Sequence, residues 1–569
     1  MSRGKFQKPF LWLFSSLPAL CLAGCDGGAT GSASGAGIVA VEAPAPAPTP
    51  APAYSIATVD AVRLAKQASF GPTPELVDHI ARMGAAAWID EQFVATGSTY
   101  SDIAAAEVPS NFCKLSDGPC LMEHHSRRAV ATRFYADAVN AGDQLRQRVA
   151  FALSQRMIAT AHVANSAAGL AAYNQIFLDN AFGNYRDILQ QVTMSSFMGR
   201  NLDLSGSSAA APSENYAREL LQLFTMGPDA LAPDGTVMLD ASGAPIPNYT
   251  TDDIRNIARA LTGWTLARLN GAPITASSMR DYTRPMIAVP SRYDAGEKRF
   301  LGVVIGSGTG QAEGVQKVVD AAFNHSSTAP HVARFLIQQL VTSNPSPAYI
   351  GRVSAVFADN GNGVRGDMKA VVRAVLLDTE ARGAVRSGAA DGKLKEPVLL
   401  MTSLARLIGF RTDGYAFVRR DTELGEPALE SPTVFNFYSA DYPLPGSTTL
   451  KSPVSNLHTT GASIRWHNLV NDWTLQASAR PEFAVEDGVA PLGTSIDWSS
   501  WEALGDDSLS LINRLDLLMM SGTMSGTQRA SLQAAAATVK DADPAARARR
   551  RAQLLIYIIG TSPLFLVDR

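Results

Sequence analysis

Apolar residues recur at helical spacing over most of the chain from residue 54 onwards. After Thr250-Thr-Asp-Asp253, which has the pattern of a capping box, apolar residues follow at positions i, i+3, i+4 and i+7. A second segment has the same periodicity at Leu145, Val149, Ala152, Leu153 and Met157. Both patterns predict amphipathic helices.

Short turns are predicted to join neighbouring helices. Ser346-Pro347 begins one apolar segment, Asn360-Gly361 ends it, and Asp367 caps the next. Strand-like sequence is confined to about 236–305, where residues 236–239 and 300–305 predict one or two hairpins. We therefore predict a mainly α fold, in which a large domain of packed helix–turn–helix units contains a small β-hairpin insertion at about 236–305.

The first 24 residues have the order of a bacterial export signal. Arg3, Lys5 and Lys8 precede an apolar run at 10–22, and Leu22-Ala23-Gly24-Cys25 follows it. The run is shorter than the ~20 residues that a membrane-spanning helix requires. The four residues ending at Cys25 resemble the lipobox of bacterial lipoproteins, whose cysteine is acylated. We expect a lipoprotein signal peptide at 1–24 and a lipid anchor at Cys25; the alternative is an ordinary signal peptide.

A spacer separates the expected anchor from the helical domain. Residues 26–53 are rich in Gly, Ala, Ser and Pro and end in alternating Ala and Pro. Such a sequence favours extended polyproline II, and its proline segment would hold the domain roughly 30 Å or more from the membrane. Asp26 resembles the inner-membrane retention signal of bacterial lipoproteins. We expect a signal peptide at 1–24, an anchor and linker at 25–53, and a helical domain at 54–569 on the periplasmic face, with the inner membrane favoured.

Two of the four cysteines remain for a disulfide. Cys21 lies in the expected signal peptide and Cys25 is the expected anchor. Cys113 and Cys120 flank a short loop, and in an oxidising compartment we expect them to be bonded to each other. Their spacing fits neither a CxxC redox motif nor a zinc site.

Composition excludes two broad classes of protein. Hydrophobic residues make up 46 % of the chain and charged residues 18 %, which excludes general disorder. The formal net charge is −3, and it becomes −6 when residues 1–24 and their three basic side chains are removed. Because there is no excess of basic residues, we expect no nucleic-acid partner.

Seven segments, in order along the chain, resemble the bacterial family catalogued as domain of unknown function 1800. They are Leu64-Ala-Lys-Gln-Ala-Ser-Phe-Gly-Pro-Thr73, Gln144-Leu-Arg-Gln-Arg-Val149, Glu214-Asn-Tyr-Ala-Arg-Glu-Leu220, residues 249–264, Lys395-Glu-Pro397, Ser431-Pro-Thr-Val-Phe-Asn-Phe-Tyr438 and Ser562-Pro-Leu-Phe-Leu566. The resemblance spans nearly all of 58–569.

This resemblance implies an exported, largely helical protein without an established activity. Members are often encoded beside a second exported family, domain of unknown function 1501, which resembles sulfatases and phosphatases and is the candidate partner. The chain departs from the family pattern at Phe151-Ala-Leu-Ser-Gln155, where many members have a tryptophan–histidine-rich segment. It also has Tyr293-Asp294 where many have His-Asp. A metal site built from those histidines is therefore not expected.

The segment 213–226 contains the main candidate site. It is predicted to be one helix, capped by Ser213 and ended by Gly227-Pro228. On a helical wheel one arc is polar and consists of Glu214, Asn215, Arg218, Glu219, Gln222 and Thr225. One interpretation is an ordinary surface helix with a Glu214–Arg218 ion pair. The other is a cleft formed with Asp203, Asp252 and Asp253, in which carboxylates in different environments divide acid and base roles.

Other motifs give no cofactor site. The only adjacent histidines, His124-His125, point about 100° apart on a helix and make a poor metal site. The loop at 359–363 lacks the ligands of a calcium-binding EF-hand, and the glycines at 306–310 lack the Lys-Ser/Thr of a phosphate-binding loop. We expect neither metal nor cofactor. Trp264 and the tryptophans at 466, 473, 498 and 501 are candidates for sugar stacking, but core packing is the more common role.

Two classes of function remain open. One is an envelope lipoprotein that binds or assembles a partner exported protein at the membrane surface. The other is a hydrolase or lyase acting on an envelope or extracellular polymer. In that case Glu214 or Glu219 would be the acid or base, Arg218 would hold an anionic group, and Asp252 or Asp253 would assist. Asp203, Asn215 and Trp264 would then contribute to binding.

Overall fold

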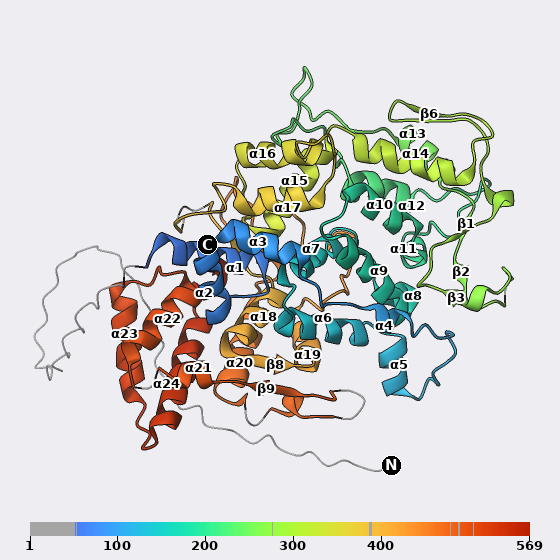
Figure 1. Ribbon diagram of the computed structural model, residues 1–569. Helices are drawn as coiled ribbons and strands as arrows, with labels where there is room; N and C mark the ends of the chain where they lie inside the picture. Colours follow the sequence, from blue (N-terminus) through green and yellow to red (C-terminus); the bar gives the residue numbers. More distant parts are fainter. Residues whose placement is uncertain are drawn as a thin grey trace, which may run out of the picture. The chain divides into compact units, whose positions relative to one another are not determined.

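Helices dominate the part of the chain that the structure describes, and the strands in that part form two-stranded sheets (Figure 1). The computed structural model describes residue 52 and residues 54–569 except 276, 386, 387, 389, 478, 479, 487–489 and 505. The expected signal peptide, Cys25, Asp26 and nearly all of the spacer lie outside the described residues. The predicted fold class, mainly α with a small β insertion, is confirmed.

The N-terminal part of the domain is entirely helical. Its helices are α1 (Ile56–Ala68), α2 (Pro74–Met83), α3 (Ala85–Val94), α4 (Ser101–Ala104), α5 (Gly118–His124), α6 (Arg128–Asn140), α7 (Gln144–Ser154), α8 (Ala161–Ala164), α9 (Ala167–Asn180), α10 (Tyr185–Met194) and α11 (Ser196–Asn201). Side-chain caps set several of the starting points; for example, Ser55 Oγ accepts from the backbone of Thr58 at 3.1 Å. The expected disulfide between Cys113 and Cys120 is present beside α5.

The middle of the chain contains most of the short strands. Its helices are α12 (Asn215–Glu219), the π-helix η1 (Leu220–Phe224), α13 (Thr251–Ala260), the 3-10 helices η2 (Leu269–Gly271) and η3 (Pro290–Arg292), α14 (Gln311–Asn324), α15 (Thr328–Leu340), α16 (Pro347–Ala358) and α17 (Met368–Leu377). The predicted capping box of α13 is present, and Asp367 caps α17 as expected. Helices α15, α16 and α17 pack against one another, as the short turns between them predict.

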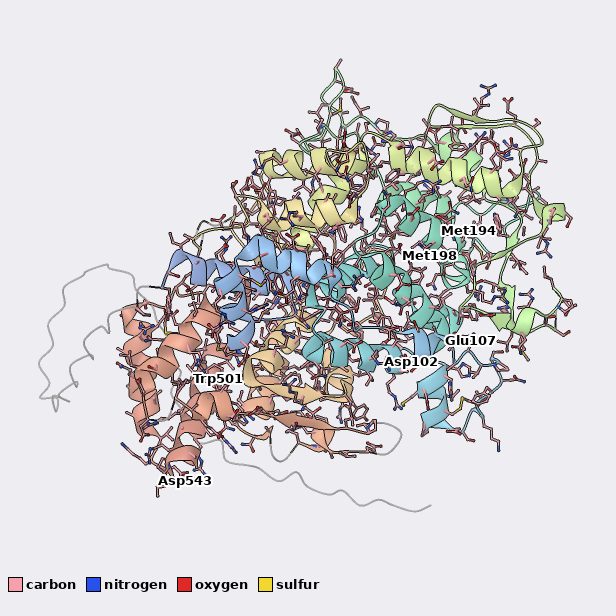
Figure 2. The ribbon with its side chains drawn as sticks, viewed as in Figure 1. Asp102, Glu107, Met194, Met198, Trp501 and Asp543 are labelled. Carbon is pink, nitrogen blue, oxygen red and sulfur yellow. A yellow bond between two sulfur atoms is a disulfide. The ribbon has the colours of Figure 1, made fainter. Side chains whose placement is uncertain are left out.

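The C-terminal part is again helical. Its helices are α18 (Pro397–Ile408), α19 (Tyr415–Leu424), the 3-10 helix η4 (Pro453–Asn456), α20 (Thr460–Thr474), the 3-10 helix η6 (Pro481–Phe483), α21 (Ser499–Glu502), α22 (Ser508–Met520), α23 (Gly526–Thr538) and α24 (Pro544–Gly560). Helix α24 contacts α20 to α23. Trp501 is buried among these helices (Figure 2), and the other four tryptophans considered for sugar stacking are buried as well.

Among the described residues, the strands form five antiparallel pairs. They are β1 (Trp264–Thr265) with β4 (Ile287–Ala288), β2 (Ala267–Arg268) with β3 (Arg280–Asp281), β5 (Lys298–Phe300) with β6 (Val303–Ile305), β7 (Lys393–Leu394) with β10 (Val567–Asp568), and β8 (Phe410–Thr412) with β9 (Thr494–Ile496). The hairpin expected at 300–305 is the β5–β6 pair. Strands are not confined to 236–305, because the β7–β10 and β8–β9 pairs lie outside it. Strands this short have no sequence alternation to reveal them.

The segment expected to form a hairpin at 236–239 is part of an irregular arm. Isolated bridges join Leu231 to Val237 and Leu239 to Pro245, without a continuous ladder. Pro233, Pro245 and Pro247 lack the N–H group that a ladder requires, which accounts for the interruption.

Aromatic packing holds α7 against its neighbours. Phe151 on α7 has its ring centroid 5.1 Å from that of Phe134 on α6 and 5.9 Å from that of Phe70. All three side chains are buried. This packing fixes the C-terminal end of α7, from which Gln155 and Arg156 follow. Among the described helices, none is long and apolar enough to cross a bilayer.

Candidate functional site

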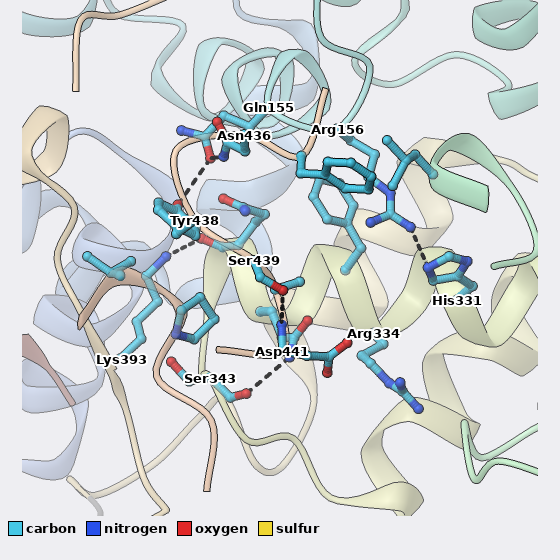
Figure 3. A pocket seen from close by; sticks show the side chains of 18 of the residues that line it. Gln155, Arg156, His331, Arg334, Ser343, Lys393, Asn436, Tyr438, Ser439 and Asp441 are labelled. Carbon is cyan, nitrogen blue, oxygen red and sulfur yellow. Dashed lines mark hydrogen bonds between the residues drawn. The ribbon is translucent and has the colours of Figure 1, made fainter. Parts of the chain in front are cut away.

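A polar cavity of about 290 Å³ lies where four distant parts of the chain meet (Figure 3). The residues after α7, helix α15, strand β7 and the loop 434–441 supply most of its lining. Gln222 and Leu223 of η1 contribute as well, together with Pro228, Ser343, Pro453 and Val454. Its charged or strongly polar side chains are Gln155, Arg156, Gln222, His331, Arg334, Gln338, Gln339, Ser343, Lys393, Asn436, Tyr438, Ser439 and Asp441.

Arg156 and His331 occupy one end of this cavity. Arg156 donates from Nη2 to Nε2 of His331, and its guanidinium also lies 5.1 Å from the ring centroid of Phe335. Because a guanidinium only donates, His331 Nε2 is an acceptor and the ring hydrogen is assigned to Nδ1. Burial, together with Arg156 and Arg334, holds the pKa of His331 well below its usual value. His331 is therefore neutral and does not add to the positive charge.

Gly227 allows the ring of His331 to reach this position. Its φ is +76°, and a Cβ atom placed on it would lie 2.8 Å from the Cε1 atom of His331. Any other residue at 227 would combine backbone strain with displacement of the imidazole ring.

Lys393 lies at the other end of the cavity, near Tyr438 (Figure 3). Its Nζ donates to the backbone carbonyl of Gln339. Burial and the nearby Arg148 lower its pKa to about 8, although Glu396, Asp568 and Glu426 oppose the shift. Lys393 is thus a cation at neutral pH whose charge is easily lost.

The cations of the cavity have no partner carboxylate of their own. Burial lowers the pKa of Arg156 to about 10. Among the described residues, no carboxylate lies within ion-pair distance of Arg156, Arg334 or Lys393. Asp441 is the one acidic residue in the lining, so the positive charges outnumber the negative ones. An anion entering the cavity would offset the cost of holding these cations away from water.

A buried carboxyl pair lies directly behind the lining. Glu396 Oε2 accepts from the hydroxyl of Tyr438 at 2.6 Å and from Nε2 of Gln155 at 3.1 Å. Glu426 Oε2 accepts from the backbone of Val398 at 3.0 Å. Both glutamates are only 1 % exposed. The Oε1 atom of each has no donor among the described residues.

The environment of Glu426 favours its protonated form. Burial and the neighbouring Glu396, which is hydrogen bonded to it, hold the pKa of Glu426 well above its usual value. A hydrogen on Glu426 Oε1 that is donated to Glu396 would satisfy both remaining oxygens.

The residues predicted from sequence form a separate, exposed cluster. Glu214 pairs with Arg218 at 3.0 Å and reaches Arg255 at 3.8 Å, and Arg255 pairs with Asp252 at 3.1 Å. These ion pairs are exposed, and each contributes little to the stability of the folded protein. The predicted i, i+4 ion pair is therefore present, but the 290 Å³ cavity includes none of these side chains.

The other predicted residues have local contacts. Asn215 Nδ2 donates to Asp203 Oδ2 at 2.8 Å, and Asp203 itself has a φ of +54°. Asp253 Oδ2 accepts from Thr250 and its Oδ1 accepts from Leu301 N at 2.8 Å, so both of its oxygens hold backbone in place. Trp264 is buried, and its Nε1 has no partner among the described residues. The structure joins Asp203 to Asn215 but uses Asp253 as a helix cap.

Glu219 differs from the exposed carboxylates. It is half-buried, and its Oε2 has no hydrogen-bond donor among the described residues. Burial raises its pKa, and the positive charge of Arg218 opposes that rise. The carboxyl group of Glu219 therefore holds a proton more readily than a fully solvated glutamate does.

The prediction of one regular α-helix over residues 213–226 was wrong. Helix α12 spans only Asn215–Glu219, the π-helix η1 follows, and Glu214 rather than Ser213 is the N-cap residue. The wider turn of a π-helix changes the direction in which later side chains point. Gln222 therefore lines the cavity with Leu223, and Thr225 is buried with its hydroxyl donating to Leu220 O at 2.6 Å.

The sequence pattern does not indicate the cavity, although one segment of its lining and one segment directly behind it belong to the family resemblance. Lys395-Glu-Pro397 and the segment ending in Tyr438 were used for the family resemblance without a chemical role. Their polar residues in otherwise apolar surroundings were the available signal. In the part of the chain that the structure describes, no three His, Cys, Asp or Glu side chains are placed to hold a metal ion.

The fold and the cavity define a mainly α-helical protein with a polar site built from distant segments. The family model described as "Protein of unknown function (DUF1800)" matches residues 63–567. The chain belongs to this family, which confirms the resemblance. A search of curated proteins found no match, and a search of solved structures found none either.

Proposed function

We propose that this chain is an exported lipoprotein that binds a negatively charged ligand in the cavity between α7, α15, β7 and the loop 434–441. The observation that carries the proposal is the set of cations in the lining, Arg156, Arg334 and Lys393, without partner carboxylates. The lipid anchor at Cys25 and the spacer at 26–53 would hold this cavity near the periplasmic face of the membrane.

A partner exported protein of the 1501 family remains a prediction from the family resemblance. It is compatible with ligand binding, because an acidic group of such a partner is one form that an anionic ligand can take. No contact among the described residues favours it over other anionic ligands.

A carboxylate-dependent hydrolase or lyase is the second candidate function. The specific observation in its favour is the Glu396–Glu426 pair, which reaches the cavity through Tyr438 and Gln155. Such a pair keeps one proton available in a site with little water. The exposed ion pairs of Glu214 and Arg218 support this function less well.

Stabilisation by inorganic sulfate tests the anion-binding proposal. A ligand that binds only the folded state raises the melting temperature, so sulfate should stabilise the protein more than chloride at equal ionic strength. The change Arg156→Gln should remove most of this difference. Arg419→Gln is the matched control, because Arg419 is an exposed arginine outside the cavity. Equal stabilisation by sulfate and chloride in the unchanged protein would refute anion binding.

A further inference from the structure

Glu396 determines which way two side chains of the lining are oriented. A carboxylate only accepts hydrogen bonds, so Tyr438 and Gln155 must both donate to its Oε2 atom. This fixes the hydroxyl hydrogen of Tyr438 towards Glu396. It also fixes the amide of Gln155 with Nε2 towards Glu396.

The remaining hydrogen-bonding capacity of these two side chains is therefore that of acceptors. Tyr438 receives a hydrogen bond from the Gln339 side chain and keeps one further lone pair on its phenol oxygen. Gln155 Oε1 has long contacts, 3.5 Å from Asn436 Nδ2 and 3.4 Å from the Tyr438 hydroxyl, and can accept a shorter hydrogen bond. Both residues line the cavity. They suit a ligand that donates hydrogen bonds. Because Lys393 and Arg156 repel a cation, neutral hydroxyl groups fit better than an ammonium group.

The opposite end of the cavity favours negative charge. Arg156 and Arg334 line it, and Figure 3 shows both at the end away from Lys393 and Tyr438. Phe335 adds apolar surface there, because its ring centroid lies 5.1 Å from the Arg156 guanidinium, and Phe435, which is 53 % exposed, adds apolar surface to the cavity lining. Aromatic surface beside a few oriented polar groups is typical of sites for small polar ligands.

We infer that the cavity binds an acidic carbohydrate, with an anionic group at Arg156 and hydroxyl groups donating to Tyr438 and Gln155. This inference rests on the proposed anion-binding function and adds the chemical class of the ligand. The anionic group is a carboxylate or a sulfate, which share charge and acceptor oxygens. Glu396 acts as a positioning residue, since it orients Tyr438 and Gln155 without lining the cavity itself.

Calorimetric titration with four probes tests the inference. The probes are trigalacturonate, its neutral methyl ester and inorganic sulfate, and a sulfated disaccharide distinguishes sulfate from carboxylate recognition. We expect the preferred acidic sugar to bind at least about tenfold more tightly than either the methyl ester or inorganic sulfate, since it combines charge and hydroxyl contacts.

Two substitutions separate the contributions of the two ends. Tyr438→Phe keeps the ring but removes the acceptor oxygen, so it should weaken binding of the acidic sugar about 3- to 10-fold and weaken sulfate binding less. Arg156→Gln should weaken binding of both the acidic sugar and sulfate. The control Arg419→Gln should change neither affinity. If Tyr438→Phe does not fold by circular dichroism, Gln155→Met removes the second acceptor and provides the same comparison.

The possible failures are distinguishable. Sulfate binding that depends on Arg156, with neither acidic sugar binding more tightly than sulfate, would overturn the carbohydrate inference and leave the proposed function intact. An acidic sugar whose affinity is unaffected by Tyr438→Phe and by Gln155→Met would also overturn it. Absence of sulfate binding in the unchanged protein would instead refute the proposed function.

Discussion

Arg156, which follows α7, donates a hydrogen bond to His331 on α15, 175 residues later in the chain. The contact orients the guanidinium without neutralising it, because the imidazole is uncharged. A neutral partner is suited to a residue that must keep its charge for a ligand. A carboxylate in the same place would compete with an anion.

Displacing His331 should therefore weaken anion binding. Gly227→Ala places a methyl group against the imidazole ring, whereas Gly243, with a similar φ of +85°, has open space around it. Both substitutions to alanine carry the cost of positive φ, roughly 1 kcal/mol. Only Gly227→Ala should also reduce the stabilisation by sulfate, measured as the shift in melting temperature. An equal reduction in Gly243→Ala would show that backbone strain, and not His331, is responsible.

Anion binding should weaken as the pH rises through about 8. The pKa of Lys393 is lowered to about 8, so its positive charge is present below that pH and lost above it. Sulfate affinity, measured by titration from pH 6.5 to pH 9.5, should fall several-fold across this range. Lys393→Arg keeps a cation over the whole range and should flatten the profile. A wild-type profile that is already flat would exclude Lys393 from the site.

The fold was more predictable from the sequence than the site was. Helical periodicity and caps such as Asp367 depend on residues within a few positions of each other, and the structure has those helices. The cavity depends on Arg156, His331, Lys393 and Tyr438, which only tertiary packing brings together. The π-helix after Glu219 was not predicted either, because a helical wheel assumes a constant number of residues per turn. Family resemblance indicated some of the right segments but supplied no chemistry for them.

Lipidation at Cys25 can be tested independently of the cavity. If the lipobox-like segment is processed as expected, a fatty-acid probe should label the wild-type protein in cells. Cys25→Ala should abolish the label and leave the protein unprocessed or free of the membrane. Cys21→Ala is a suitable control, because Cys21 precedes the expected cleavage site and should not affect labelling. If the Cys25→Ala variant is still labelled, Cys25 is not the lipidated residue, and the proposed lipid anchor at this position is wrong.

Asp137 on α6 should limit stability at neutral and alkaline pH. Burial raises the pKa of Asp137 to about 7. The positive charge of Arg133 opposes this rise, and the negative charge of Asp143 adds to it. Because the folded pKa exceeds the unfolded one, the folded state loses stability as the pH rises from about 4 to about 7, and the full cost persists above pH 7. Asp137→Asn removes this titration. It should match the wild type at pH 4 and be more stable at pH 8, by at most about 4 kcal/mol.

Asp102 provides the matched control for this prediction, because its carboxylate pairs with Arg133 at 2.8 Å and that contact lowers its pKa. Its folded pKa lies below the unfolded one, so its contribution is present above the unfolded pKa and lost as the pH falls through the folded pKa. Asp102→Asn should thus lower the melting temperature at pH 8, opposite in sign to Asp137→Asn. Melting temperatures of the wild type and both variants, measured between pH 4 and pH 8, test these opposite effects on stability. If the difference between Asp137→Asn and the wild type does not change with pH, Asp137 is ionised without cost in the folded protein, and the burial argument for α6 is wrong.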